Sequence, residues 1–135
     1  MPARVDGPHM KRVISTDDAP DAVGAYSQAT TNGDLLFTAG QIPLTPDGEL
    51  RDDASIAEQT ELALENLGGI LREAGASYDD VLKVTVFLDD IDDFAEMNET
   101  YAGFFETEPP ARSAVEAGAL PKGVGVEIEA IADVS

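Results

Sequence analysis

The sequence contains no cysteine and no tryptophan, and His9 is its one histidine. Without cysteine, the chain forms no disulfide, has no thiolate nucleophile and binds no zinc through sulfur. His9 follows Gly7 and Pro8 in a segment typical of a cloning remnant, so we predict that residues 1–9 are an added tail. We therefore expect one working domain over residues 10–135 that has no histidine, which excludes a Ser-His-Asp triad and histidine metal ligands.

Positive charge is also scarce. Eight lysine and arginine residues stand against 27 acidic residues, and the formal net charge is −19. Such a surface repels phosphate groups, so we expect no binding to nucleic acid. The negative charges also repel one another, and salt shortens the reach of that repulsion. We interpret the acidic composition as adaptation to a salt-rich cytoplasm (a halophilic protein); the alternative is an ordinary acidic protein.

Long apolar runs are missing as well. No segment approaches the ~18 apolar residues of a membrane-spanning helix, and no hydrophobic signal segment opens the chain. We therefore expect no membrane association and a cytoplasmic location. The length of 135 residues and the hydrophobic content of 43% fit one globular domain with its own core.

The first half of the chain predicts three strands and a helix. We expect strands over residues 11–16, 26–31 and 35–40, and Asn32-Gly33 between the last two is a strong hairpin signal. Ser55 and Glu58 form a capping-box pattern at the start of a helix. Apolar residues then recur at helical spacing until Gly75 ends the pattern. The pair Gly68-Gly69 inside this helix lacks a phosphate-loop lysine, so we interpret it as a packing site.

The second half predicts one more helix and three more strands. Residues 81–88 alternate as a strand, with one face made by Leu82, Val84, Val86 and Leu88. Asp92 or Asp93 caps the second helix, and strands follow over residues 112–117 and 124–134. The apolar stripe of that helix comprises Phe94, Met97, Tyr101 and Phe104. In the last strand, Glu127, Glu129, Ile131 and Asp133 alternate with inward-facing apolar residues.

This order, β-β-β-α-β-α-β-β, predicts an α+β fold: a mixed sheet with two helices on one face. The other face of the sheet cannot be fully polar, because Phe87 and Ile131 belong to one of the two faces. A partly apolar, uncovered face usually packs against another subunit. We therefore expect the chain to form an oligomer.

Two residues are candidates for chemistry. Arg112 follows Pro109-Pro110, which stiffens the chain, and a fixed guanidinium suits bidentate capture of a carboxylate. Glu127 lies on one face of the last strand, where a carboxylate can hold a water and take its proton. From composition alone, a structural ion pair for Arg112 and solvent exposure for Glu127 remain the simpler interpretations. The acidic residues 89–93 lack the spacing of a calcium loop and are more simply a helix cap.

Several spaced motifs together resemble the Rid/YjgF family of reactive-intermediate imine deaminases, over nearly all of residues 10–134. Residues 110–115, followed by 126–129, are similar to the C-terminal signature of that family. Further matching motifs occur, in the family's order, at residues 40–43, 93–98 and 120–122.

The resemblance implies a chorismate-mutase-like two-layer subunit, a homotrimer and active sites in clefts between subunits. The implied reaction is the hydrolysis of 2-imino acids or their enamine tautomers, such as 2-iminopropanoate and 2-iminobutanoate, to 2-keto acids and ammonia. No cofactor or metal is implied. By position, Arg112 would hold the substrate carboxylate and Glu127 would activate water. The residues implied to contact the substrate are Tyr26, Gly40, Asn98 and, through its backbone, Ala114.

The sequence departs from the family pattern at three positions. Ala114 stands where many relatives carry cysteine, Ala39 where many carry serine, and Ala25 replaces a frequent proline beside Tyr26. A thiol or hydroxyl at the first two positions therefore cannot be essential here if the chain is active. Other functions stay open: a module that binds a small carboxylate without turnover, a ribonuclease or translation inhibitor, and a chaperone.

Overall fold

The computed structural model of the chain describes residues 10–135; the predicted tail of residues 1–9 lies outside this range. Six strands form one mixed sheet in the order β1-β2-β3-β6-β4-β5. The predicted α+β fold with two helices on one face of the sheet is confirmed. The strands are β1 Arg12–Ile14, β2 Ala29–Thr31, β3 Leu35–Thr38, β4 Val81–Leu88, β5 Ala111–Glu116 and β6 Val126–Asp133.

The last strand of the chain, β6, lies in the interior of the sheet. It pairs antiparallel with β3 on one side and with β4 on the other. β5 pairs in parallel with β4 and forms one edge of the sheet, after the chain has crossed over through a helix. β6 is therefore the one strand that joins β1-β2-β3 to β4-β5.

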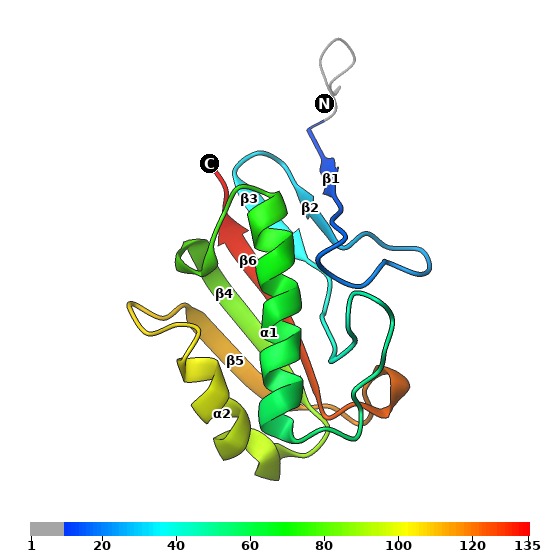
Figure 1. Cartoon of the computed structure of the whole chain (residues 1–135). Helices are drawn as coiled ribbons and strands as arrows, with labels where there is room; N and C mark the ends of the chain where they lie inside the picture. Colours follow the sequence, from blue (N-terminus) through cyan, green and yellow to red (C-terminus); the bar gives the residue numbers. More distant parts are fainter. Residues whose placement is uncertain (1–9) are drawn as a thin grey trace.

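Both α-helices cover the same face of the sheet (Figure 1). α1 spans Ile56–Glu73 and packs along β6, and α2 spans Phe94–Ala102 beside β5. The Ser55 hydroxyl accepts a hydrogen bond from the backbone N–H of Glu58, as predicted. The Glu58 carboxylate accepts a hydrogen bond from the same hydroxyl and not from the backbone N–H of Ser55, so the capping box is incomplete. Gly75 follows α1 with φ +80°, the left-handed conformation expected after a helix end.

One predicted strand face is wrong at Leu82. The pairing of β4 with β6 shifts its register between Val81 and Lys83. This irregularity places Val81 in the core and leaves Leu82 50% exposed. Val84, Val86 and Leu88 face the core as predicted. Strand periodicity assumes regular pairing, so it cannot anticipate such a local irregularity.

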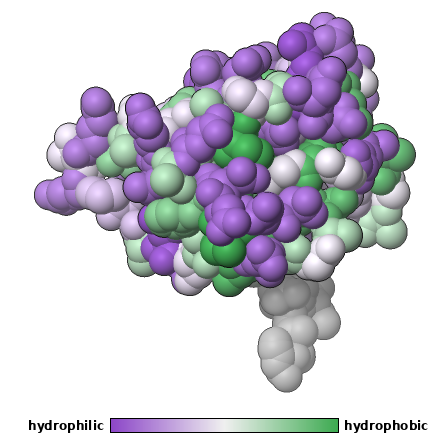
Figure 2. Space-filling model, turned by 90° about the horizontal axis from the view of Figure 1, so that it is seen from below, coloured by the Kyte–Doolittle hydropathy of each residue, from purple (hydrophilic) through white to green (hydrophobic). Residues whose placement is uncertain are grey.

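β6 separates a buried face from an open one. Val126, Ile128, Ala130 and Ala132 are buried under the helices, as predicted. The other face of the sheet is not covered by a helix of the described part of the chain (Figure 1). Polar and apolar side chains mix on this face. Its apolar members include Val13, Phe37 and Val115, which are 60%, 46% and 43% exposed. Hydrophilic side chains dominate the lower face of the molecule, with smaller apolar areas between them (Figure 2).

Within residues 10–135, no helix is both long enough and apolar enough to span a bilayer.

Candidate functional site

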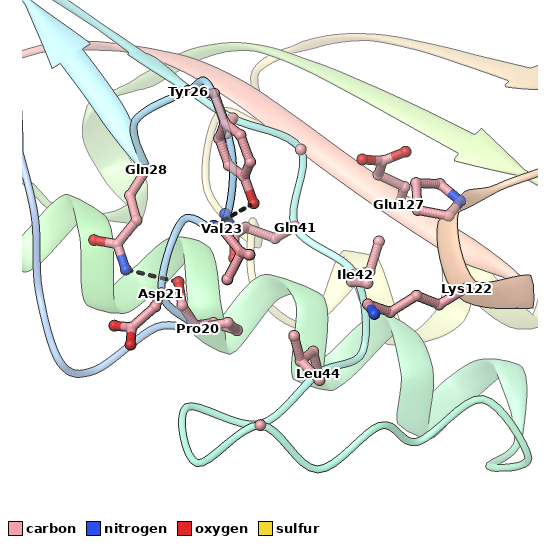
Figure 3. Close-up of a pocket in the computed structure, with 14 residues that line it drawn as sticks. Pro20, Asp21, Val23, Tyr26, Gln28, Gln41, Ile42, Leu44, Lys122 and Glu127 are labelled. Carbon is pink, nitrogen blue, oxygen red and sulfur yellow. Dashed lines mark hydrogen bonds between the residues drawn. The ribbon is translucent and has the colours of Figure 1, made fainter.

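Three of the residues singled out in the sequence line one pocket of about 660 Å³. Tyr26 comes from the loop before β2, Gly40 from the loop after β3, and Glu127 from β6. In Figure 3, Glu127 and Lys122 lie on one side of the pocket, and Tyr26 with Pro20 lies on the other. The wall is completed by Asp21, Val23, Gln28, Ala39, Gln41, Ile42, Leu44, Gly48 and Pro121.

Gly40 is held directly against Glu127. The backbone of the next residue, Gln41, forms an isolated antiparallel bridge with Ile128, with hydrogen bonds of 2.8 and 3.0 Å. This bridge brings the loop after β3 alongside β6, where the Glu127 side chain emerges. A Cβ at Gly40 would lie 2.8 Å from the carboxyl carbon of Glu127 and closer still to Oε2. Only glycine therefore fits at this position while Glu127 keeps its conformation.

Glu127 is a half-buried carboxyl group in an acidic neighbourhood. Burial raises its pKa above the ordinary value of 4.5, and the nearby Glu129 carboxylate raises it further. Both effects favour the protonated, uncharged form. A carboxylate whose pKa lies closer to neutrality is a stronger base once it is ionised. Such a group in a pocket is a candidate for proton transfer.

The opposite wall is built on Gln28, which the sequence did not single out. Its buried side chain donates to the carbonyls of Thr16, Ala19 and Pro20, and its Oε1 accepts the Thr16 amide at 2.7 Å. These bonds fix the loop that carries Pro20 against β2. Tyr26 is 56% exposed and precedes β2, which begins at Ala29 and not at residue 26 as predicted. One buried glutamine between two loops gives no periodic signal in a sequence.

Lys122 is the one basic residue in the described lining of this pocket. Its backbone lies in the left-handed region, with φ 59° and ψ 16°. Residues other than glycine adopt this conformation rarely, and when they do the site is often functional. The motif of residues 120–122 contributed to the family resemblance, but the sequence did not assign Lys122 a role.

Arg112 and Asn98 form a second group, on β5 and α2. Nη1 of Arg112 donates to Oδ1 of Asn98 at 2.6 Å. The Arg112 guanidinium also lies over two aromatic rings of α2, 5.3 Å from the centroid of Phe94 and 4.7 Å from that of Tyr101. Ala114 lies two residues further along β5, on the same face, and packs against the core. Arg112 is therefore held by α2, and no acidic residue within residues 10–135 forms an ion pair with it.

Within one chain, the sheet separates Arg112 from Glu127. Arg112 is in register with Val84 and then Ala130, whose side chains are buried beneath the helices. Glu127 is in register with Phe87 and then Val115 on the open face. The two side chains therefore lie on opposite faces of the sheet, and one chain does not bring them into the same pocket. The six candidate residues divide into two groups: Tyr26, Gly40 and Glu127 in one, and Arg112, Asn98 and Ala114 in the other.

The acidic segment at residues 89–93 has a local structural role. The side chain of Asp90 accepts the amide of Asp92 and caps a short 3₁₀ helix. Asp93 occupies the N-cap of α2 without a side-chain hydrogen bond. Across the described part of the chain, no group of three acidic or histidine side chains is arranged to hold a metal ion.

Comparison with known proteins places these features in a family. Residues 16–134 match the family model described as Endoribonuclease L-PSP. A RutC family protein of Pyrococcus abyssi is 52% identical over 122 residues, which cover 90% of this chain and 96% of that protein. The 2-iminobutanoate/2-iminopropanoate deaminase of Rattus norvegicus is 46% identical over 123 residues, covering 91% and 90% of the two chains.

Solved structures agree with the sequence matches. The crystal structure of Escherichia coli TdcF with bound serine superposes with a TM-score of 0.87 at 44% identity. The superposition covers 92% of this chain and 99% of TdcF. The match to the family model, over residues 16–134, spans both the pocket beside β6 and Arg112 on β5. On these grounds, the chain belongs to the Rid/YjgF family, whose family model carries the description Endoribonuclease L-PSP.

Proposed function

We propose that the protein hydrolyses 2-imino acids and their enamine tautomers to 2-keto acids and ammonia. The observation that carries this proposal is the pair of groups described above: an arginine with no acidic partner among the described residues, and a pocket carboxyl group with a raised pKa. The deaminase activity in the name of the rat relative, which is 46% identical, supports the same reaction. The substrates that we propose are 2-iminopropanoate and 2-iminobutanoate.

Arg112 is the proposed anchor for the substrate carboxylate. No acid lies within ion-pair distance of its guanidinium among residues 10–135, although the chain carries 27 acids. A guanidinium has five N–H donors, and Arg112 makes one hydrogen bond among the described residues. Its remaining donors suit bidentate binding of a carboxylate. The serine bound to TdcF is a small molecule that also bears a carboxylate.

Glu127 is the proposed general base. The ionised carboxylate takes a proton from a water molecule as the water oxygen bonds to the carbon of the protonated imine, and the π electrons of the C=N bond move onto nitrogen. The product is a tetrahedral carbinolamine with a hydroxyl and an amine on one carbon. Glu127 then returns the proton to nitrogen, and the C–N bond breaks with its electron pair leaving on ammonia. The hydroxyl proton passes back to Glu127, and from there to solvent, as the keto group forms. General-base catalysis of this kind contributes typically ~10²–10⁴-fold.

Each site requires two subunits, because the sheet of one chain separates Arg112 from Glu127. Arg112 lies on β5 at the sheet edge, within reach of a neighbouring chain. The open face carries exposed apolar side chains, including Phe37 and Val115, that a second copy could cover. We propose a homotrimer in which Arg112 of one subunit faces the Tyr26, Gly40 and Glu127 pocket of the next.

Ammonia release tests the reaction. 2-Iminobutanoate is generated in situ at high salt, and the ammonia released from it is measured with wild-type protein and with Arg112→Ala. Wild type should release ammonia well above the spontaneous rate, and the variant should approach that rate. Equal rates for the two proteins would exclude the proposed role of Arg112.

Mixed oligomers test the shared site. Arg112→Ala and Glu127→Ala subunits are each expected to be inactive alone. After denaturation and refolding together, some sites combine an intact arginine from one subunit with an intact glutamate from another. Activity should therefore reappear in the mixture. A mixture as inactive as its components, with subunit exchange demonstrated by mass, would contradict sites built from two chains.

A second candidate is a binding module that holds a small carboxylate without turnover. Alanine at positions 39 and 114, where many relatives carry serine and cysteine, favours it. Calorimetry with 2-ketobutyrate, together with no ammonia release, would support this function. The description of the family model also names an endoribonuclease, but a net charge of −19 opposes the approach of RNA.

A further inference from the structure

Three residues on one side of α2 hold the guanidinium of Arg112. Phe94, Asn98 and Tyr101 are spaced i, i+4 and i+7, so they lie on one face of the helix. Two present aromatic rings, with centroids 5.3 and 4.7 Å from the guanidinium carbon, and Asn98 supplies one acceptor. We call this set the α2 clamp.

The clamp contacts the guanidinium mainly in ways that leave its hydrogen-bond donors free. An aromatic ring attracts a cation through its face and takes up none of its N–H groups. An acidic partner would instead occupy the two parallel N–H groups of the fork. Among residues 10–135, the hydrogen bond to Asn98 uses one nitrogen, Nη1. The clamp thus restrains the side chain without occupying the edge that a carboxylate would need.

Aromatic rings, and not an acidic residue of the described chain, support the Arg112 guanidinium. One ion pair is formed among residues 10–135, Arg51 with Glu49 at 2.7 Å, so the lack of an acidic partner does not by itself distinguish Arg112. Arg112 is distinguished by the two aromatic rings over which its guanidinium lies. Phe94 is half-buried and Tyr101 is 4% exposed, so the rings form a fixed support. Such support reduces the conformational entropy that a free arginine loses on binding a ligand.

We propose that Tyr101, with Phe94, is a positioning residue that presents the open edge of the Arg112 guanidinium to a ligand carboxylate. This inference rests on the role proposed for Arg112 as the carboxylate anchor. It also reassigns Asn98 from direct contact with the substrate to positioning of the arginine. Tyr101 touches Arg112 and is not expected to touch the reacting atoms, so its loss should affect binding more than turnover.

The test measures the affinity for 2-ketobutyrate by calorimetry and the KM and kcat for 2-iminobutanoate, at constant salt. Tyr101→Leu removes the ring and should weaken ketobutyrate binding about 5- to 30-fold, the range expected for a partly desolvated cation–π contact. KM should rise by a similar factor, with kcat nearly unchanged. Tyr101→Phe keeps the ring and should restore wild-type affinity.

Two controls separate positioning from a general loss of structure. Phe104→Leu removes another ring near the end of α2, one that contacts Tyr78 and not Arg112, and should leave the affinity unchanged. 2-Ketobutyramide lacks the carboxylate, so its weaker binding should not depend on Tyr101. If Tyr101→Leu fails to fold, Phe94→Leu tests the other, less buried ring of the clamp with the same expected direction.

The outcomes distinguish this inference from the proposed function. Folded Tyr101→Leu and Phe94→Leu proteins that bind ketobutyrate like wild type would overturn the inference, even if imine hydrolysis depends on Arg112. A Tyr101→Phe protein as weak as Tyr101→Leu would also overturn it, because the hydroxyl and not the ring would then matter. Arg112-dependent binding that weakens in the clamp variants, without any hydrolysis, would support the inference and contradict the deaminase function.

Discussion

Gly40 and Glu127 illustrate how closely the pocket is built at the level of single residues. The glycine matters for its missing side chain, because the space that a Cβ would take is filled by the Glu127 carboxylate. The backbone φ of Gly40 is not in the left-handed region, so alanine meets no conformational barrier there. The effect of a substitution should therefore fall on Glu127 alone.

Gly40→Ala should displace the Glu127 carboxylate and remove most of its general-base contribution. We expect kcat for imine hydrolysis to fall by about 10²-fold, the lower end of what such a base supplies. Gly118→Ala is the matched control, because no atom lies within 4 Å of the added Cβ and activity should not change. Unchanged kcat in Gly40→Ala would show that the position of the carboxylate is unimportant.

The raised pKa of Glu127 predicts the pH dependence. The base acts when ionised, so activity should fall as pH drops through a pKa above the ordinary value of 4.5. Glu129→Gln removes the second cause of the raised Glu127 pKa, so the fall in activity on the acidic side of the pH profile, its acidic limb, should move to lower pH. Burial, the larger cause, remains, so the limb should stay above the ordinary value. Profiles of kcat/KM against pH check this, and an unmoved limb would count against Glu127 as the base.

At the residue scale, the sequence predicted which residues line the candidate site better than which residues those contact. Tyr26, Gly40 and Glu127 were singled out, and the structure places them in one pocket. The contact of Asn98 with Arg112 and the network of Gln28 were missed, because each joins segments that are distant in the chain. The sequence did not show on which faces of the sheet Arg112 and Glu127 lie, because the faces of neighbouring strands depend on register, which single-strand periodicity does not give.

Among the elements, α1 depends on one close contact at Gly68. A Cβ there would collide with the Tyr78 side chain, 2.8 Å from Cζ and closer to the hydroxyl. That hydroxyl donates to the Leu64 carbonyl at 2.7 Å. Burial raises the pKa of Tyr78 to about 12, so the phenol stays protonated as a donor. The contact attaches the turn before β4 to the middle of α1 and supports the interpretation of Gly68 as a packing site.

Gly68→Ala should destabilise the protein by about 1–3 kcal/mol, as expected for overpacking. This is notable because alanine favours helix by ~1 kcal/mol over glycine. Gly103→Ala is the control: its φ is −68° and the added Cβ makes only an ordinary contact, so stability should not fall. Denaturant unfolding measures both. A smaller cost of Gly68→Ala in a Tyr78→Ala background would identify the collision as the cause.

Element order and type were predictable because the periodic patterns are long. The confirmed boundaries of α1 follow from its cap and from Gly75, both local signals. Sheet order was not predictable, since nothing local indicates that the last strand pairs between β3 and β4. The exposure of Leu82 was also missed, because the irregular pairing beside it belongs to two strands at once.

For the whole molecule, charge is the dominant feature. One ion pair, between Arg51 and Glu49, is formed among residues 10–135, against a net charge of −19. Most acids are therefore solvated, and hydrophilic residues cover much of the surface seen in Figure 2. Their mutual repulsion falls as the screening length shortens, from about 8 Å at physiological salt to about 3 Å at 1 M.

Dilute salt should therefore weaken both the fold and the proposed trimer. Association brings like-charged subunits together, so we expect the oligomer to dissociate as salt is lowered, before or together with unfolding. Light scattering across a salt series measures the mass, and circular dichroism follows the fold. Sodium chloride is compared with a non-ionic osmolyte at matched osmolarity. Both are excluded from the protein surface, but only the salt screens the repulsion between acidic side chains. A trimer unchanged in dilute buffer would argue against salt adaptation.

The interior position of β6 also has a consequence for biosynthesis. Until residues 126–133 leave the ribosome, β3 and β4 have no strand to pair with on their facing sides. Both then expose unpaired backbone groups, a state open to intermolecular pairing. A nascent chain therefore cannot complete its sheet before β6 is synthesised, and a chain truncated before residue 126 would be an aggregation-prone fragment without Glu127.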